Sequence, residues 1–189
     1  MSQFKIAVIV GSNRRQSVNR RLAQALAKLV RDRLAFTFVR IDDLPLYNQD
    51  DEANLPASVS RFKGEVASAD GVLFVTPEHS RSIPAVLKNA VDWGARPWGQ
   101  NSWTGKVAAV TGTSPGAIST AMAQQHLRQI LGAQGVVLSG GEAYLQFKPE
   151  LIDADDTITD EGTRGFLKQF VDQFASLVAR LAEAPRAAA

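Results

Sequence analysis

The start of the chain combines three patterns that few folds accommodate together. A short apolar run over residues 4–10 stops at Gly11, and six small, polar or cationic residues follow it. Apolar side chains then recur at helical spacing, at Val18, Leu22, Ala25, Leu26, Leu29 and Val30. This order predicts a buried strand, a polar turn and an amphipathic helix.

The rest of the chain repeats the alternation of strand and helix. Four further apolar runs predict strands at residues 36–41, 71–76, 107–111 and 136–139. The alternating pattern of the first of these suits an edge strand with one exposed face. Helical patterns lie between and after the runs, at residues 56–66, 84–91, 117–131 and 166–181. Such an order predicts an α/β fold with a parallel sheet covered by helices on both faces.

Composition excludes several kinds of chemistry. The 189 residues include no cysteine, so disulfides, thiolate catalysis and Cys-ligated metals are ruled out. Two histidines without a carboxylate cluster make a catalytic metal improbable, so we expect none. The net charge is only +2 and the basic residues are scattered, which argues against a nucleic-acid partner. No signal-peptide pattern or membrane-length apolar run is visible, and we expect a cytoplasmic protein with no membrane partner.

The polar turn after the first strand has the features of a phosphate site. Backbone N–H groups at a helix N-terminus, together with the helix dipole, favour an anion. Ser12, Ser17 and Asn19 add neutral donors, and Arg14 and Arg15 add positive charge. Neither the dinucleotide fingerprint nor the Walker loop is present, which points to the phosphate of a mononucleotide. The alternative is a simple turn with surface arginines.

Two further loops should meet this turn, because ligands of parallel sheets bind beyond the carboxyl ends of the strands. These loops are residues 76–82 and 112–116, both rich in Gly, Pro, Ser and Thr. Within the first, Glu78 and His79 are the only adjacent pair suited to acid–base chemistry. Such a pair is more often part of a turn than a catalytic dyad, and no nucleophile elbow accompanies it.

The remaining histidine and the tryptophans have less certain roles. His126 lies in a predicted helix and is interpreted as a surface or interface residue. Trp93, Trp98 and Trp103 surround a glycine-containing segment and are able to stack on an aromatic ligand. Tryptophans more often fill a core or a subunit contact, and this second interpretation is favoured.

Several motifs taken together resemble the NAD(P)H-dependent FMN reductase family, which includes bacterial chromate- and quinone-reducing enzymes. They are Gly11-Ser12-x-Arg14-x-x-Ser17-x-Asn19-Arg20, Thr76-Pro77-Glu78, Pro84-x-x-Leu87-Lys88-Asn89-Ala90-x-Asp92-Trp93, Gly105-Lys106 and the segment from His126 to Leu131. The resemblance implies a flavodoxin-like three-layer fold, with a five-stranded parallel sheet in the order 2-1-3-4-5. It also implies bound FMN and a homodimer or homotetramer. On this basis we expect one domain over residues 1–183 and a disordered tail at 184–189.

The resemblance also implies roles for individual residues. Around the FMN phosphate it places Gly11, Ser12, Arg14, Ser17, Val18 and Asn19. Around the flavin ring it places Pro77, Glu78, His79, Ser80, Thr113, Ser114 and Gly116. Many relatives carry Tyr-Asn where this chain has His79-Ser80. Arg81, next to the ring loop, is a candidate contact for the phosphate of a nicotinamide nucleotide.

The function implied by the resemblance is hydride transfer. NAD(P)H would reduce the bound FMN, which would then reduce a quinone, a free flavin, chromate or a similar small molecule in ping-pong order. Because the flavin supplies the redox chemistry, no catalytic side chain is expected. Two alternatives remain open: a flavodoxin-type electron carrier, although its docking surface would be acidic, and a flavin-free phosphate-binding protein. The physiological acceptor, the choice between NADH and NADPH, and the choice between dimer and tetramer also remain open.

Overall fold

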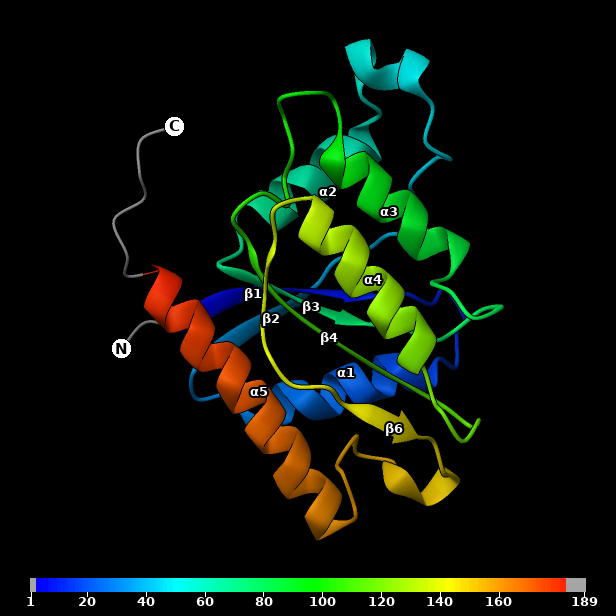
Figure 1. The fold of residues 1–189 in the computed structure, drawn as a ribbon, viewed down its shortest axis with the longest axis vertical. Helices are drawn as coiled ribbons and strands as arrows, with labels where there is room; N and C mark the ends of the chain where they lie inside the picture. Colours follow the sequence, from blue (N-terminus) through cyan, green and yellow to red (C-terminus); the bar gives the residue numbers. More distant parts are fainter. Residues whose placement is uncertain (1–2, 183–189) are drawn as a thin grey trace.

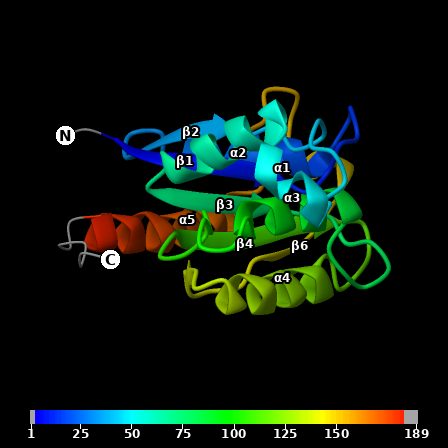
Figure 2. The same cartoon turned by 90° about the horizontal axis from the view of Figure 1, so that it is seen from above.

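The computed structural model describes residues 3–182 and contains a parallel sheet flanked by helices (Figure 1). The strands are β1 Phe4–Val10, β2 Leu34–Phe38, β3 Gly71–Val75, β4 Val107–Ser114, β5 Val137–Leu138 and β6 Tyr144–Gln146. The α-helices are α1 Val18–Leu29, α2 Ala57–Ala67, α3 Ala85–Ala95, α4 Ala121–Ala133 and α5 Glu161–Ala182, and the 3₁₀ helices are Gln49–Asn54 and Pro149–Leu151. The strand order is β2-β1-β3-β4-β5, which confirms the predicted 2-1-3-4-5 arrangement. Figure 2 shows the strands side by side from β2 across to β6.

Each face of the sheet carries its own apolar core. Side chains alternate along a strand, so Ile6 and Val8 of β1 point to opposite sides from Ala7 and Ile9. The first set packs against α1 and α5, and the second against α2, α3 and α4. Because the central strands are covered on both sides, their apolar runs are continuous rather than alternating.

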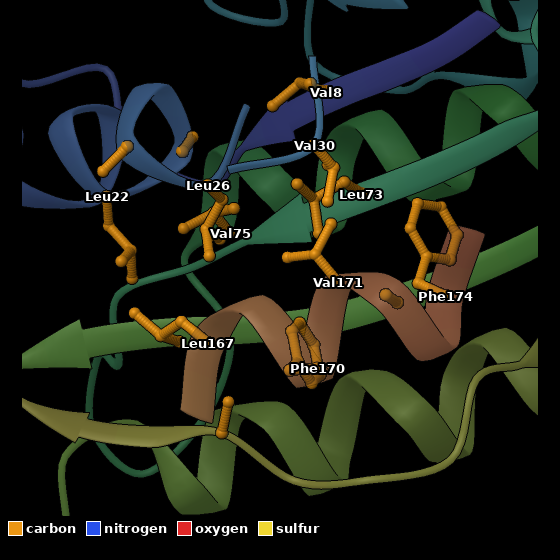
Figure 3. Close-up of a cluster of buried hydrophobic side chains, with 14 of the residues drawn as sticks. Val8, Leu22, Leu26, Val30, Leu73, Val75, Leu167, Phe170, Val171 and Phe174 are labelled. Carbon is orange, nitrogen blue, oxygen red and sulfur yellow. The ribbon is translucent and has the colours of Figure 1, made fainter. Parts of the chain in front are cut away.

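The longest helix, α5, anchors the first of these cores. Leu167, Phe170, Val171 and Phe174 lie at helical spacing along one face of α5 and are almost fully buried. Figure 3 shows Val171 next to Leu73 of β3, and all four side chains belong to the same buried cluster as Leu73 and Val75. The sheet is therefore held firmly beneath the loops that follow β1, β3 and β4.

The second strand differs from its predicted range of 36–41. It begins at Leu34, which pairs with Phe4 of β1, and it ends at Phe38. The Val39 N–H still donates to the Val8 carbonyl at 2.9 Å, but the strand pairing ends at Phe38, and the buried Val39 and Ile41 pack in the second core. The sequence pattern therefore reported burial correctly and the end of the strand incorrectly.

The expected fifth strand is divided in two, so the sheet has six strands instead of five. β5 covers only Val137–Leu138 and pairs with the start of β4, at Val107 and Ala108. β6 pairs with the end of β4, where Gly112 faces Tyr144. β6 contains one buried residue, Leu145, and thus has no apolar run by which to predict it.

The helix expected over residues 117–131 begins later, at Ala121. Residues 115–120 instead form a turn in which the Ser119 N–H donates to the Gly116 carbonyl at 2.9 Å. Ser119 has a φ of 52°, which is incompatible with a continuing helix. The predicted tail at 184–189 lies outside the described residues. Among residues 3–182, no helix has the length and apolar character needed to span a bilayer.

Candidate functional site

Three loops at the carboxyl ends of β1, β3 and β4 line a cavity of about 420 Å³. This volume falls within the range typical of small-molecule and cofactor pockets. The lining residues are Gly11, Ser12, Asn13, Arg14, Ser17, Val18, Asn19, Pro77, Glu78, His79, Pro84, Val86, Thr113, Ser114 and Pro115. The loops predicted to converge therefore do so, and we call this space the central cavity.

Most of the predicted site residues line the central cavity, but not all of them. Ser80, Arg81 and Gly116 are outside its lining. Sequence reasoning missed Asn13, Pro84, Val86 and Pro115. Asn13 and Pro115 are neighbours of predicted residues, whereas Pro84 and Val86 come from the start of α3, where the sequence offered only a helix signal.

One end of the cavity is suited to an anion. Ser17 caps α1, and its Oγ accepts the Arg20 N–H at 3.3 Å, which leaves the hydroxyl hydrogen free to donate. The N–H groups of Val18 and Asn19 belong to the first turn of α1 and have no acceptor within the helix. The exposed Arg14 has no ion-pair partner among residues 3–182. These donors offer neutral and charged hydrogen bonds to one phosphate group.

The Asn19 side chain, which was assigned to the phosphate, has a different partner. Its Nδ2 donates to the Thr113 carbonyl at 3.0 Å, and its Oδ1 accepts the Thr113 N–H at 2.9 Å. Both residues are only 1% exposed. Asn19 therefore joins the first turn of α1 to the end of β4, and its backbone N–H stays available to an anion.

Glu78 also acts within the protein rather than toward the cavity. Its side chain is 7% exposed, and Oε2 accepts the Ala123 N–H in the first turn of α4 at 3.1 Å. Oε1 accepts from Arg81 at 3.1 Å. A carboxylate at a helix N-terminus is stabilised by the helix dipole. This geometry matches the interpretation of Glu78 as part of a turn.

The segment after Glu78 is a tight hairpin with its own hydrogen bonds. His79 and Ser82 exchange two backbone bonds of 2.9 Å, and the turn residues Ser80 and Arg81 have φ values of 49° and 65°. Two positive values in succession define a turn that prefers Asn-Gly. Ser82 Oγ also lies 2.7 Å from Nδ1 of His126, which is exposed on α4 as predicted. The hairpin is thus tied to α4 at Ser82 as well as at Glu78.

The strain in this turn gives a measurable prediction. Replacing Arg81 by Gly removes the left-handed penalty, whereas replacing it by Ala removes the same ion pair and keeps the penalty. We expect Arg81→Gly to be more stable than Arg81→Ala by about 1 kcal/mol in urea unfolding. Equal stability of the two variants would show that the turn relaxes without strain.

The loop after β4 differs from the expected strand-to-helix turn. The Gly116 N–H donates to Ser114 Oγ at 3.2 Å, and Thr113 Oγ1 donates to the Leu145 carbonyl at 2.6 Å. α4 begins five residues beyond Gly116, and Glu78 occupies the Ala123 N–H at its N-terminus. A helix over residues 117–131 would have its N-terminus beside Ser114 and Gly116, whereas the N-terminus of α4 lies at Ala121.

The tryptophans divide between core and surface. Trp93 and Trp103 are fully buried, and their indole N–H groups donate to the carbonyls of Pro45 and Val91 at 2.8 and 2.9 Å. Trp98 is 88% exposed. None of the three lines the central cavity. The core interpretation is confirmed for Trp93 and Trp103.

The central cavity matches a ligand with an anionic end and a flat apolar body. Hydroxyls, helix N–H groups and Arg14 lie at one end, and Pro77, Pro84, Val86 and Pro115 supply apolar wall. At Gly11, a Cβ atom would lie 2.7 Å from Thr76 Oγ1 and 3.0 Å from Leu87 Cδ2, so only glycine fits where the loop leaves β1. Phosphate donors beside an apolar wall fit flavin mononucleotide. Together with the 2-1-3-4-5 sheet, they define a flavodoxin-like flavoprotein.

Comparison with known proteins extends this class to a family. A family model described as NADPH-dependent FMN reductase matches residues 4–150, and the chain belongs to this family. FMN and a reduced nicotinamide nucleotide are the cofactor and the electron donor of such enzymes, and the chain is an enzyme of this kind.

The similar proteins cover nearly the whole chain. A 2-hydroxy-1,4-benzoquinone reductase of Burkholderia sp is 50% identical over 176 residues, covering 93% of this chain and 96% of its own. A quinone reductase of Pseudomonas putida is 48% identical over 181 residues, covering 94% and 97%. The solved structure of FerB, a flavoenzyme NAD(P)H:(acceptor) oxidoreductase from Paracoccus denitrificans, is 47% identical with a TM-score of 0.91, covering 94% and 98%. The flavodoxin-like fold is therefore established.

Proposed function

We propose that the physiological acceptor is a quinone, reduced with electrons from NAD(P)H through FMN held in the central cavity. The convergence of the three loops into one cavity with a phosphate end and an apolar wall carries this proposal. The printed activities of the Burkholderia and Pseudomonas putida relatives support a quinone as the acceptor. When bound, FMN supplies the hydride chemistry, and the protein supplies position and electrostatics.

The phosphate end holds the cofactor. Ser12 and Ser17 donate through their hydroxyls, Arg14 supplies a guanidinium, and Val18 and Asn19 supply backbone N–H groups. Such donors bind a phosphate dianion most tightly when they are already oriented, because little conformational entropy is then lost on binding. Gly11 allows the loop to pass close to β3 on its way to these positions.

The apolar wall and the two further loops hold the flavin ring. Pro77, His79, Thr113 and Ser114 line the cavity from the ends of β3 and β4. We place Glu78, Ser80 and Gly116 in the same two loops as supporting residues. Glu78 fixes the first loop through α4, and Gly116 fixes the second through Ser114. Arg81 already pairs with Glu78, so its role toward a nicotinamide phosphate remains a proposal.

Nicotinamide and quinone use the same open side of the cavity in turn, which gives ping-pong kinetics. The test is NAD(P)H consumption by the FMN-loaded protein at several fixed concentrations of a benzoquinone, with free FMN and chromate as rival acceptors. Parallel double-reciprocal lines and the highest kcat/KM with the quinone are expected. Intersecting lines would contradict a shared site, and a preference for chromate or free FMN would contradict the choice of acceptor.

The proposal extends to assembly and location. A homodimer or homotetramer is supported by the family resemblance and by the exposed apolar side chains of Leu46 and Trp98, which are 82% and 88% exposed. Surfaces of this kind often mark contacts between proteins. A cytoplasmic location is supported by the absence of cysteine.

The role of Arg14 can be measured directly. A charge-assisted hydrogen bond contributes about 1.5–3 kcal/mol, so Arg14→Ala is expected to weaken FMN binding about tenfold to a hundredfold. The measurement is quenching of flavin fluorescence on titration of the apoprotein. Arg164→Ala, which removes an exposed arginine of α5, is the charge-matched control and should leave the affinity unchanged. Equal affinity of Arg14→Ala and the control would remove Arg14 from the phosphate site.

A further inference from the structure

A second, smaller cavity lies on the other side of the loop after β1. Its volume is about 140 Å³, and it is bounded by that loop and by the chain leaving β2. The lining residues are Val10, Ser12, Asn13, Arg14, Arg15, Arg20, Val39, Arg40, Ile41 and Asp42. β2 and β3 flank β1 on opposite sides, so this cavity and the central cavity share only the loop between them. We call it the arginine pocket.

The arginine pocket carries a marked excess of positive charge. Four guanidinium side chains line it, against one carboxylate, that of Asp42. Arg40 donates to Asp42 at 2.8 Å, and this bond holds the pKa of the Asp42 carboxyl below its usual value. Among residues 3–182, Arg14 and Arg15 form no ion pair, and Arg20, which lies over the Phe38 ring at 5.8 Å, interacts with Asp42 through charge alone, without an ion pair. Like charges gathered around one hollow repel each other unless an anion neutralises them.

Size and chemistry restrict the anion. The arginine pocket is much smaller than the central cavity, so it suits a head group rather than a nucleoside. Guanidinium groups recognise phosphate through paired N–H donors, and several of them suit a dianionic phosphate. The FMN phosphate is already assigned to Ser12, Arg14, Ser17 and the helix N–H groups at the start of α1, which leaves Arg15, Arg20 and Arg40 for a second anion. The other phosphate-bearing molecule in the reaction is the nicotinamide nucleotide.

We propose that the arginine pocket binds the 2′-phosphate of NADPH and thereby makes the chain selective for NADPH over NADH. This inference rests on the proposed function. The two nucleotides differ only in that phosphate, so a site built for it separates them. In doubly wound dinucleotide enzymes, an arginine near the end of the second strand commonly accommodates this group. Arg40 lies two residues beyond the end of β2 and lines the arginine pocket together with Arg15 and Arg20.

The test measures binding rather than turnover. Adenosine 2′,5′-bisphosphate and adenosine 5′-monophosphate are titrated into the FMN-loaded protein by calorimetry. The bisphosphate is expected to bind about tenfold or more tightly than the monophosphate. Arg15→Ala and Arg40→Ala should each weaken the bisphosphate about tenfold and leave the monophosphate unchanged, with Arg164→Ala as the control. Asp42→Asn should strengthen the bisphosphate several-fold, because it removes the one carboxylate of the pocket lining and leaves Arg40 with only the longer contact of 3.8 Å to Asp43. The opposite signs distinguish a phosphate site from general loss of folding.

Three outcomes overturn the inference. The first is equal binding of the two adenosine phosphates by the unmodified protein. The second is weaker FMN binding in Arg15→Ala and Arg40→Ala with unchanged bisphosphate binding, which would assign the arginine pocket to the flavin phosphate. The third is weaker bisphosphate binding in Arg81→Ala alone, which would move the site to the ring loop. If the bisphosphate binds as expected but neither nicotinamide is oxidised, the inference stands and the proposed function fails.

Discussion

Gly112→Ala is expected to destabilise the protein by more than about 3 kcal/mol. A Cβ atom at Gly112 would lie 2.0 Å from the Thr76 carbonyl oxygen and 2.7 Å from Thr120 Oγ1, and real Cβ contacts do not fall below 3.0 Å. The main obstacle is backbone, and Thr76 is itself held by an N–H bond to the Thr111 carbonyl at 3.0 Å. The clash can therefore be relieved only if the carboxyl ends of β3 and β4, next to the central cavity, move apart.

The measurement is the free energy of unfolding in urea, together with FMN affinity. Gly132→Ala is the matched control, because no atom lies within 4 Å of a Cβ there and the residue is inside α4. The free energy of unfolding of that control should rise by about 0.5–1 kcal/mol, because alanine has a higher helix propensity than glycine. A Gly112→Ala protein as stable as the control would mean that the ends of β3 and β4 are free to move apart.

Asn19→Ala is the second change with a large expected effect. It should lower the free energy of unfolding by about 2–6 kcal/mol. The substitution leaves the N–H and the carbonyl of Thr113 without their partner, and Thr113 is 1% exposed, so water cannot replace the amide. Each unsatisfied buried group costs about 1–3 kcal/mol. The link between α1 and β4 is lost as well, so FMN affinity should fall even though the Asn19 side chain is not assigned a phosphate contact.

Unfolding free energy and FMN affinity are both measured for this variant. Asn48→Ala is the control, because it removes an amide that accepts the Asp50 N–H at 3.2 Å in an exposed position. Water can satisfy the freed group there, so the loss should be far smaller. Similar losses for Asn19→Ala and Asn48→Ala would show that the bonds to Thr113 contribute little.

The fold was largely predictable because continuous apolar runs report strands that are covered on both faces. The prediction of strands was wrong where residues are buried without strand pairing, or paired with little burial. Val39 and Ile41 are buried beyond the end of β2, and their alternation extended the predicted strand past Phe38. At the other edge, β6 has a single buried residue and gave no signal. A hydrophobic pattern records burial, and strand pairing is only one way to achieve it.

The loops of the site were predictable from topology, whereas the partners within them were not. The carboxyl ends of parallel strands meet at one edge, which brought the three loops together without knowledge of any contact. The bond between Asn19 and Thr113 joins residues 94 positions apart, and that between Glu78 and Ala123 joins residues 45 apart. Both use polar side chains that seemed available to a ligand. In a sequence, a side chain that binds the protein and one that binds a cofactor look the same.

The hairpin of residues 79–82 has a kinetic consequence. Its backbone bonds, its link to His126 and the anchoring of Glu78 all join groups of the protein itself. Because these bonds are internal, we expect the wall to keep its shape whether or not flavin is bound, so that docking involves no entropic penalty of ordering a loop. Cofactor departure and return then require no refolding of this segment, so exchange of flavin with solution is limited by desolvation and diffusion rather than by loop closure.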